Sequence, residues 1–408
     1  MSGNGFEPQL GEMRYRWVIL VVAWLTYVSF GLVLYSFAPL VSPVQRDLSL
    51  SYAQAGVILG SWQFVYIFTA IPIGLATDKI GPRRMIGIGA AIITLSCFLR
   101  AVASSFEIML LAVALFGFGG PAVSIGIPKV VSIWFTGKEK SIAQGIGQTA
   151  PNATAFVILS TMNSMLVPWM HSWRSIFLFL TTVSFIIFIL WWIVSREAIQ
   201  KRGMNESSLP LLKGLSAIIK VRNAMVIPVV GIAYFMLTHG VSNWLPTIIE
   251  QTGVMATQAG VMAAIPPAVS VPASVIIPRV FSKRRRTVAA LLLILGSFTS
   301  FAIGTFSGTM LDVVLVLQGI CIGSISPTLV LILQETPAIG SKLMGIAAGL
   351  YYSIGEVGGF LGPSLVGYYR GLYSFQVGLS AVTIVCVIAL VPLLTLTRPD
   401  PQAQRCIP

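Results

Sequence analysis

Charged residues are scarce in this 408-residue chain: Asp, Glu, Lys and Arg together make up 10% of it, whereas hydrophobic residues make up 56%. A water-soluble domain carries about 25% charged residues, so this chain lacks the charge that would cover a surface in water. The mean hydropathy of +0.87 agrees with that conclusion. The composition therefore excludes a soluble globule and predicts an integral membrane protein.

Cysteine is scarce as well, with four residues, and none of them has the C-x-x-C spacing of a metal or redox site. The chain also lacks a Walker-type Gly-x-x-x-x-Gly-Lys-Ser/Thr segment, the phosphate-binding loop of ATP-driven pumps. The absence of this loop excludes transport powered by this chain's own ATP hydrolysis. We expect no cofactor, no metal site and no enzymatic activity.

Apolar segments long enough to cross a bilayer as a helix, about 20 residues, recur twelve times along the chain. They lie at residues 17–40, 54–77, 85–104, 107–134, 142–166, 175–194, 224–247, 256–278, 287–306, 311–334, 343–368 and 375–396. We expect an all-α integral membrane protein with twelve transmembrane helices. An even number of spans places both ends of the chain on the same side of the membrane.

Basic residues outnumber acidic ones, 26 to 13, and their positions predict the orientation. Of the 26, 21 fall in segments on the side of the two chain ends, and four (Arg46, Arg100, Arg174 and Arg370) fall on the other side. Cytoplasmic connections carry the excess of Lys and Arg in membrane proteins. We therefore expect a multi-pass cell-membrane protein with both ends in the cytoplasm, and we interpret the positive charge as a marker of topology, with no nucleic-acid partner.

The longest polar connection divides the chain into two sets of six spans. We expect an N-terminal half at residues 1–194, a central cytoplasmic loop at 195–223, a C-terminal half at 224–398 and a tail at 399–408. An internal repeat supports this division, because Gln-Ala-Gly-Val opens both the second span (residues 54–57) and the eighth (residues 258–261).

The connection after the second span has the pattern glycine, three residues, aspartate, two residues, glycine and a basic pair. The residues are Gly74, Asp78, Gly81, Arg83 and Arg84. This pattern resembles the cytoplasmic signature of the major facilitator superfamily, and the twelve spans and the central loop extend the resemblance over the whole chain. It implies two parallel six-helix halves around a midplane site that is exposed alternately to each side, with this loop as a conformational switch.

A narrower resemblance lies in the second half. The segment Asn243-Trp-Leu-Pro-Thr247, followed by Gln258-Ala-Gly260, is similar to the corresponding stretch of cyanate, nitrate and small organic anion permeases. Nitrate porters place an arginine in the second and eighth spans to hold the anion, and neither span contains one here. The departure argues against nitrate itself as the substrate.

Three ionisable residues lie inside the predicted spans, where a charge costs about 2.5–3.5 kcal/mol on insertion scales. Lys129 lies ~9 Å from the cytoplasmic end of its helix, and we expect it either to attract the substrate's negative charge or to anchor at lipid headgroups. Glu356 lies ~21 Å into its span. A carboxyl group there either gains and loses a proton during transport or, permanently protonated, donates a structural hydrogen bond. His239 either binds substrate or packs.

Polar and aromatic side chains at helical spacing add candidates for the substrate site. Asn243 lies one turn after His239, and Gln148 and Asn152 share one face of the fifth span. Such polar faces line a cavity or join helices together. Three aromatic residues are candidate walls of the site, with core packing as the alternative: Tyr35, Trp62 and Tyr352.

These observations favour a monomeric secondary active transporter of a small, anionic organic solute, coupled to protons. Two alternatives stay open: an exporter of a hydrophobic, drug-like compound, and a sensor that binds a solute without moving it. The short loops and tails leave little room for the output domain that a sensor needs.

Overall fold

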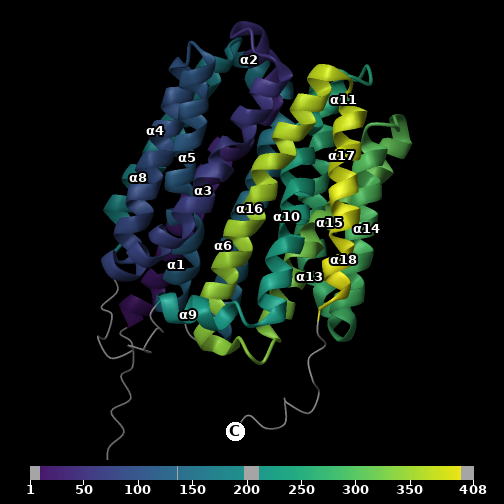
Figure 1. Ribbon diagram of the computed structural model, residues 1–408. Coiled ribbons are helices and arrows are strands. Elements are labelled where there is room, and N and C mark those ends of the chain that lie inside the picture. Colours follow the sequence, from purple (N-terminus) through teal and green to yellow (C-terminus); the bar gives the residue numbers. More distant parts are fainter. Residues whose placement is uncertain (1–9, 136, 197–210, 397–408) are drawn as a thin grey trace, which may run out of the picture.

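The computed structural model describes residues 10–135, 137–196 and 211–396. Within these ranges all regular secondary structure is helical (Figure 1). The first group of helices is α1 (Leu10–Tyr35), α2 (Val41–Asp47), α3 (Tyr52–Ile80), α4 (Pro82–Val102), α5 (Phe106–Trp134), α6 (Gly137–Thr161), α7 (Val167–Met170) and α8 (Trp173–Val194). The second group is α9 (Leu211–Ile218), α10 (Arg222–Ser242), α11 (Leu245–Glu250), α12 (Ala256–Ala263), α13 (Ile265–Val280), α14 (Arg285–Ile303), α15 (Gly308–Gln334), α16 (Gly340–Leu372), α17 (Phe375–Ile388) and α18 (Leu390–Leu394).

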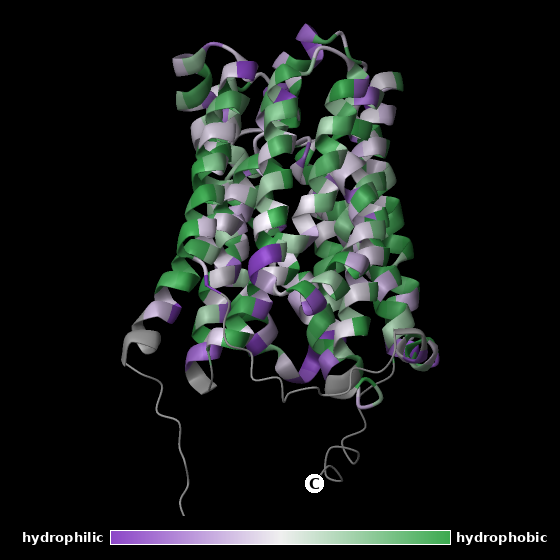
Figure 2. Ribbon diagram, turned by 90° about the vertical axis from the view of Figure 1, so that its left-hand side faces the viewer, coloured by the Kyte–Doolittle hydropathy of each residue, from purple (hydrophilic) through white to green (hydrophobic). Residues whose placement is uncertain are grey.

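Eleven helical segments of the described chain are long and apolar enough to cross a membrane. The 33-residue α16 runs beside them through the bundle as the twelfth (Figure 1). Hydrophobic residues form a broad belt around the middle of the bundle, and hydrophilic residues gather toward its ends (Figure 2). The prediction of an all-α, twelve-helix membrane protein is confirmed.

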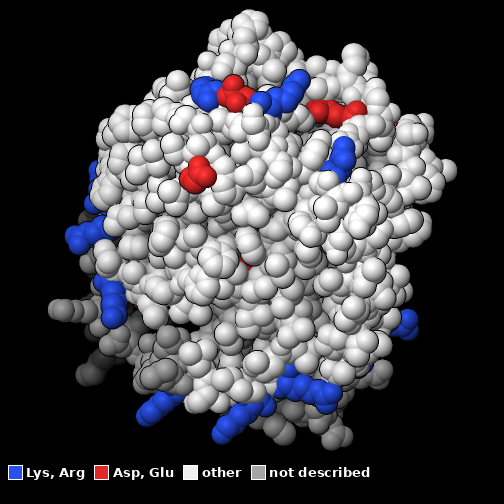
Figure 3. Space-filling view, turned by 45° about the horizontal axis from the view of Figure 1, so that its top comes forward, with Lys and Arg blue, Asp and Glu red and all other residues white. Residues whose placement is uncertain are grey.

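The two ends of the bundle differ in charge. At one end of the bundle α1 begins, α3 turns into α4 and α18 finishes (Figure 1). Basic residues are exposed at this end, and we call it the basic end. Its exposed basic side chains include Lys79, Arg84, Lys220, Lys283 and Arg284. The opposite end is largely uncharged, with Asp or Glu beside Lys or Arg near its rim (Figure 3).

The turn from α3 to α4 at the basic end follows from two adjacent residues. Gly81 ends α3 with φ 94°, a conformation that favours glycine because it has no Cβ. Pro82 occupies the first turn of α4, where its missing N–H group leaves no intrahelical hydrogen bond unmade. This two-residue turn between the helices therefore fixes the positions of Asp78 before it and Arg83 after it.

The two groups of helices meet mainly where α3 packs on α16 and where α6 packs on α12 and α13. Toward the opposite end the backbones nearly touch: a Cβ added at Gly56 would lie 2.5 Å from the carbonyl oxygen of Pro363, and one at Gly60 2.6 Å from that of Phe360. Toward the basic end, a Cβ added at Gly145 on α6 or at Gly345 on α16 would meet no atom within 4 Å. The groups are packed tightly at the opposite end and loosely at the basic end.

Candidate functional site

Three polar side chains from three helices converge where the two groups meet. Gln63 comes from α3, His239 from α10 and Glu356 from α16, and we call them the polar cluster. A Cβ added at Gly359 would lie 3.0 Å from Cγ of Gln63 and 3.2 Å from Cδ2 of His239, and it would collide with the Glu356 carboxylate. A methyl group at this position would therefore displace the Glu356 carboxylate and crowd the other two side chains.

Within the polar cluster Gln63 and Glu356 are buried and His239 is half-buried, and several of the buried polar atoms have no hydrogen-bond partner. Nε2 of His239 lies 3.7 Å from Oε2 of Glu356, too far for a good hydrogen bond. That oxygen has no hydrogen-bond partner, and neither does either polar atom of the fully buried Gln63 amide. Each unsatisfied buried polar atom costs about 1–3 kcal/mol. Such a concentration in one place is typical of a site that a ligand, a proton or water completes.

Aromatic rings enclose His239. Trp62 meets the imidazole edge to face, with ring centroids 5.6 Å apart, and Phe235 stacks on it at 5.9 Å with only 9° between the planes. Tyr66, one turn after Trp62, hydrogen-bonds through its hydroxyl with Ser124 at 3.3 Å. The rings hold the imidazole in a fixed orientation toward Glu356.

Tyr352 lies beside the cluster and is partly accessible. It lies one turn before Glu356 and is 41% exposed, and it is near Glu356, near Tyr27 and Tyr66 of the first group and near Tyr234 of the second. Tyr352 is therefore close to residues of both groups of helices. Tyr35 belongs to the same surroundings, within electrostatic range of Tyr27 and Tyr234.

The structure thus brings together five of the candidates that the sequence predicted, in and around the polar cluster: Tyr35, Trp62, His239, Tyr352 and Glu356. Asn243, one turn from His239, is half-buried, and its side-chain nitrogen has no hydrogen-bond partner. On α6, Gln148 is exposed and Asn152 half-buried. Within the described ranges neither of these two side chains forms a hydrogen bond, and nothing links them to the cluster.

Lys129 lies elsewhere. Its ammonium group pairs with the carboxylate of Asp78, whose side chain is 63% exposed at the basic end. Asp78 follows Gln63 by 15 residues on α3, which corresponds to ~22 Å along the helix axis. The structure therefore places Lys129 beside the predicted switch loop, well away from the polar cluster.

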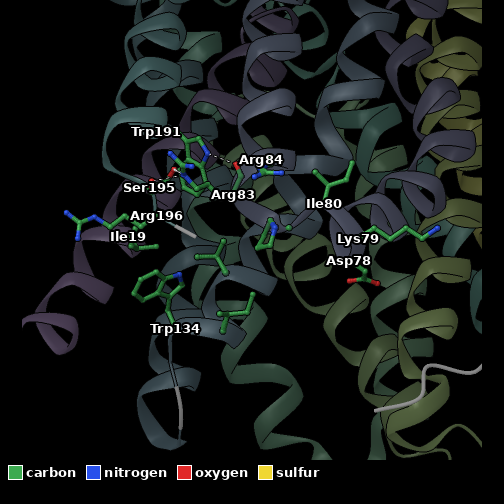
Figure 4. Close-up of a pocket in the computed structure, with 14 residues that line it drawn as sticks. Ile19, Asp78, Lys79, Ile80, Arg83, Arg84, Trp134, Trp191, Ser195 and Arg196 are labelled. Atoms are coloured by element: carbon green, nitrogen blue, oxygen red, sulfur yellow. Dashed lines mark hydrogen bonds between the residues drawn. The ribbon is translucent and has the colours of Figure 1, made fainter. Parts of the chain in front are cut away.

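The switch loop borders a pocket of about 250 Å³ at the basic end (Figure 4). Arg83 donates from Nε to the carbonyl oxygen of Ser195 at 2.7 Å, and Trp191 donates from Nε1 to the carbonyl oxygen of Arg83 at 2.9 Å. The start of α4 is therefore fastened to the end of α8. Gly74 lies one turn before Asp78, and Arg84 is exposed beside the pocket.

Two buried polar residues, Gln63 and Arg100, were not among the site residues predicted from the sequence. Gln63 was not considered because amides carry no charge, although it follows Gly60 by three residues on a helix face that Gly56 and Gly60 mark as a close contact. Arg100, counted from the sequence among the basic residues on the side opposite the two chain ends, lies inside the first group with 2% exposure. It donates to the carbonyl oxygen of Val33 at 2.7 Å and lies 5.7 Å from the ring of Phe116. Its place near the end of α4 agrees with the predicted span at residues 85–104, but its burial was not predicted.

No group of three or more His, Cys, Asp or Glu side chains that could hold a metal ion occurs in the described residues. The polar cluster offers one carboxylate, one imidazole and one amide. That set can bind a small polar molecule and can hold a proton.

Comparisons with known proteins agree with this architecture. The sequence profile of the Major Facilitator Superfamily matches residues 23–363. A protein of Agrobacterium vitis named for tartrate transport is 26% identical over 95% of this chain and 89% of its own length. The nitrate/nitrite transporter NrtP of Picosynechococcus is 31% identical, over 34% of this chain and 26% of its own length.

The solved structures agree as well. The crystal structure of a bacterial homologue of the human lysosomal transporter Spinster covers 93% of this chain and 96% of its own, with a TM-score of 0.76 at 15% identity. That similarity shows the fold. Together with the family profile, it establishes that this chain is a membrane transporter of the Major Facilitator Superfamily.

Proposed function

We propose that the protein is a proton-coupled secondary transporter of small organic anions, and that the polar cluster holds both the proton and the substrate. The observation that carries the proposal is the meeting of two ionisable groups at the junction of the two groups of helices: Glu356, which is buried and has an unpaired carboxylate oxygen, and the half-buried His239. The relative named for tartrate transport supports an organic anion as the substrate.

The pair suggests how a proton and an anion are coupled. With Glu356 ionised, the imidazolium of His239 faces a carboxylate of the protein and the cluster is neutral. A proton on Glu356 removes that attraction and leaves the imidazolium free to donate a charge-assisted hydrogen bond to a substrate carboxylate. When Glu356 loses the proton, it competes with the substrate for His239 and expels it. One proton then accompanies each carboxylate that binds.

Transport also requires the site to open to each side in turn. We propose that the halves at residues 1–194 and 224–398 rock about the polar cluster, joined by the loop at 195–223. Their tight packing at the opposite end and loose packing at the basic end correspond to a site open toward the basic end. By the positive-inside rule that end faces the cytoplasm, in the cell membrane. The pair of Lys129 and Asp78 and the turn at Gly81 would set the position of the switch loop, and the protein acts as a monomer.

An exporter of hydrophobic compounds is the second candidate. The rings of Trp62 and Phe235 around His239 favour it, because aromatic walls bind apolar molecules well. The unsatisfied atoms of Gln63 and Glu356 favour a polar substrate instead, since an apolar molecule would leave them unpaired.

Counterflow in proteoliposomes tests the proposal. Vesicles containing the purified protein and preloaded with unlabelled tartrate or malate are expected to take up the labelled acid faster than empty vesicles, and an imposed inward proton gradient is expected to drive accumulation. Protein-free vesicles give the background. If no small carboxylate stimulates exchange while lipophilic compounds bind, the protein is an exporter of the second kind.

A further inference from the structure

We infer that Gln63 recognises a hydroxyl group of the transported anion, which makes small 2-hydroxycarboxylates the preferred substrates. This inference rests on the proposed function and narrows its substrate class. Gln63 has 0% exposure, and neither Nε2 nor Oε1 of its amide has a hydrogen-bond partner. Both ends of a buried amide are rarely left unpaired, because the great majority of buried side-chain polar atoms are hydrogen-bonded.

The two ends of the amide define what would satisfy it. Nε2 donates and Oε1 accepts. A carboxylate or an inorganic oxyanion accepts only, so it can pair with Nε2 and leaves Oε1 unsatisfied. A hydroxyl group both donates and accepts, and it is therefore the complement of an amide. A simple anion therefore leaves one end of this amide without a partner.

The cluster also indicates where the carboxylate of the substrate would bind. His239 is the one basic side chain of the cluster, and its Cδ2 and the Cγ of Gln63 lie 3.2 Å and 3.0 Å from the same point, the Cβ that Gly359 lacks. One small molecule can therefore reach both side chains. A carboxylate on His239 and a hydroxyl on the neighbouring carbon, directed at Gln63, match the arrangement. A simple carboxylate of the same length would satisfy the imidazolium alone.

The titratable groups around Glu356 are consistent with this division of roles. They are His239, Tyr66, Tyr234, Tyr351 and Tyr352. The tyrosines are neutral, so His239 is the one group among them that can balance a carboxylate. Gln63 contributes no charge, and its role is to distinguish between anions of equal charge.

The experiment compares pairs of acids that differ by one hydroxyl group: malate with succinate, and lactate with propionate. In wild-type proteoliposomes we expect the hydroxylated acid to compete at a concentration about tenfold lower than its partner. That ratio corresponds to the free energy of one well-made hydrogen bond. In Gln63→Leu the ratio is expected to fall close to one, because the affinity for the hydroxylated acid falls more than the affinity for its partner. Gln63→Met, a closer match in shape, repeats the test.

Gln318→Leu is the matched control. Gln318 is a buried glutamine in the second group whose Oε1 accepts a hydrogen bond from Thr299, so its loss is expected to leave the malate-to-succinate ratio as in wild type. Thermal unfolding in detergent, compared with wild type, shows that the Gln63 variants are folded. Equal affinity for both acids in wild type, or a ratio unchanged in both Gln63 variants, overturns the inference and leaves the proposed function standing. Absence of exchange with every carboxylate overturns both.

Discussion

Two acid–base pairs, one inside the predicted spans and one at the basic end, differ in every respect that bears on transport. His239 and Glu356 come from two helices at the junction of the two groups, with side chains 19% and 7% exposed. Lys129 and Asp78 belong to one group, at the basic end, and the carboxylate is 63% exposed. The first pair has an unpaired carboxylate oxygen and aromatic walls, whereas the second joins α5 to the last turns of α3.

The difference shows that an ionisable residue in a membrane span is not by itself a substrate site. Lys129 reaches the headgroup region because its long side chain can extend toward water. Glu356 cannot do so from the middle of α16, and it must find its partners inside the bundle. The polar cluster should therefore control substrate and proton, and the pair at the basic end should control only the rate at which the protein changes conformation.

The largest effect is expected from Gly359→Ala. The added Cβ collides with the carboxylate of Glu356 and crowds Gln63 and His239, and a displacement of about 1 Å at a reacting site can cost about a hundredfold in rate. Gly345→Ala, on the same helix with no atom within 4 Å of the added Cβ, is the control. Counterflow rates normalised to the amount of reconstituted protein measure both. A Gly359→Ala protein with the wild-type rate would show that the cluster does not handle substrate.

The second-largest effect is expected from His239→Asn. It removes the one cation of the cluster, and a hydrogen bond to a charged group is worth about 1.5–3 kcal/mol, so the apparent affinity for a carboxylate should fall at least about tenfold. His171→Asn, at the turn before α8 with φ 57°, is the matched control, because asparagine tolerates that conformation. Competition curves at two pH values are the measurement. Equal affinities in the two variants would contradict the role of His239.

Most of the fold could be predicted from the sequence, because each transmembrane segment must be apolar and long enough by itself to cross the membrane. The positions of Lys and Arg between the segments then indicate the orientation. The convergence at Gly359 could not, since it depends on how α3, α10 and α16 pack against one another. Glu356 and His239 were predicted because their charge makes them conspicuous in an apolar helix. Gln63 was missed because an uncharged amide has a structural role as often as a functional one. The surroundings of Lys129 depend on a contact between α5 and the end of α3, which the sequence spacing of Lys129 did not reveal.

Lys129→Ala and Asp78→Asn should have smaller and similar effects. Each breaks the same partly exposed ion pair, and such pairs contribute about 0.2–1 kcal/mol, so we expect transport rates to change by a factor of about five or less with the apparent affinity retained. The double variant should be no worse than either single one. The prediction that Lys129 attracts the substrate is decided by the same assay: a large loss of affinity in Lys129→Ala alone would support it.

The smallest effect is expected from Glu250→Gln at the opposite end. Burial raises the pKa of the Glu250 carboxyl group, against the opposing influence of its hydrogen bond from Ser42 and of Arg46. A carboxyl group with a raised pKa contributes stability that is complete below its unfolded pKa of 4.5 and is lost as the pH rises through the folded value. The difference between the melting temperatures at pH 4.5 and pH 7.5, measured in detergent, should therefore be about one degree smaller in the variant than in wild type. An unchanged difference would show that Glu250 has no influence on stability.

The central claim, that Glu356 carries the coupled proton, is tested most directly by recording external pH while substrate enters proteoliposomes. Wild-type protein should make the weakly buffered external medium more alkaline when malate is added, because protons enter with the anion. Glu356→Gln should exchange preloaded malate at a measurable rate and produce no alkalinisation. Alkalinisation by Glu356→Gln at the wild-type ratio of protons to substrate would contradict the account.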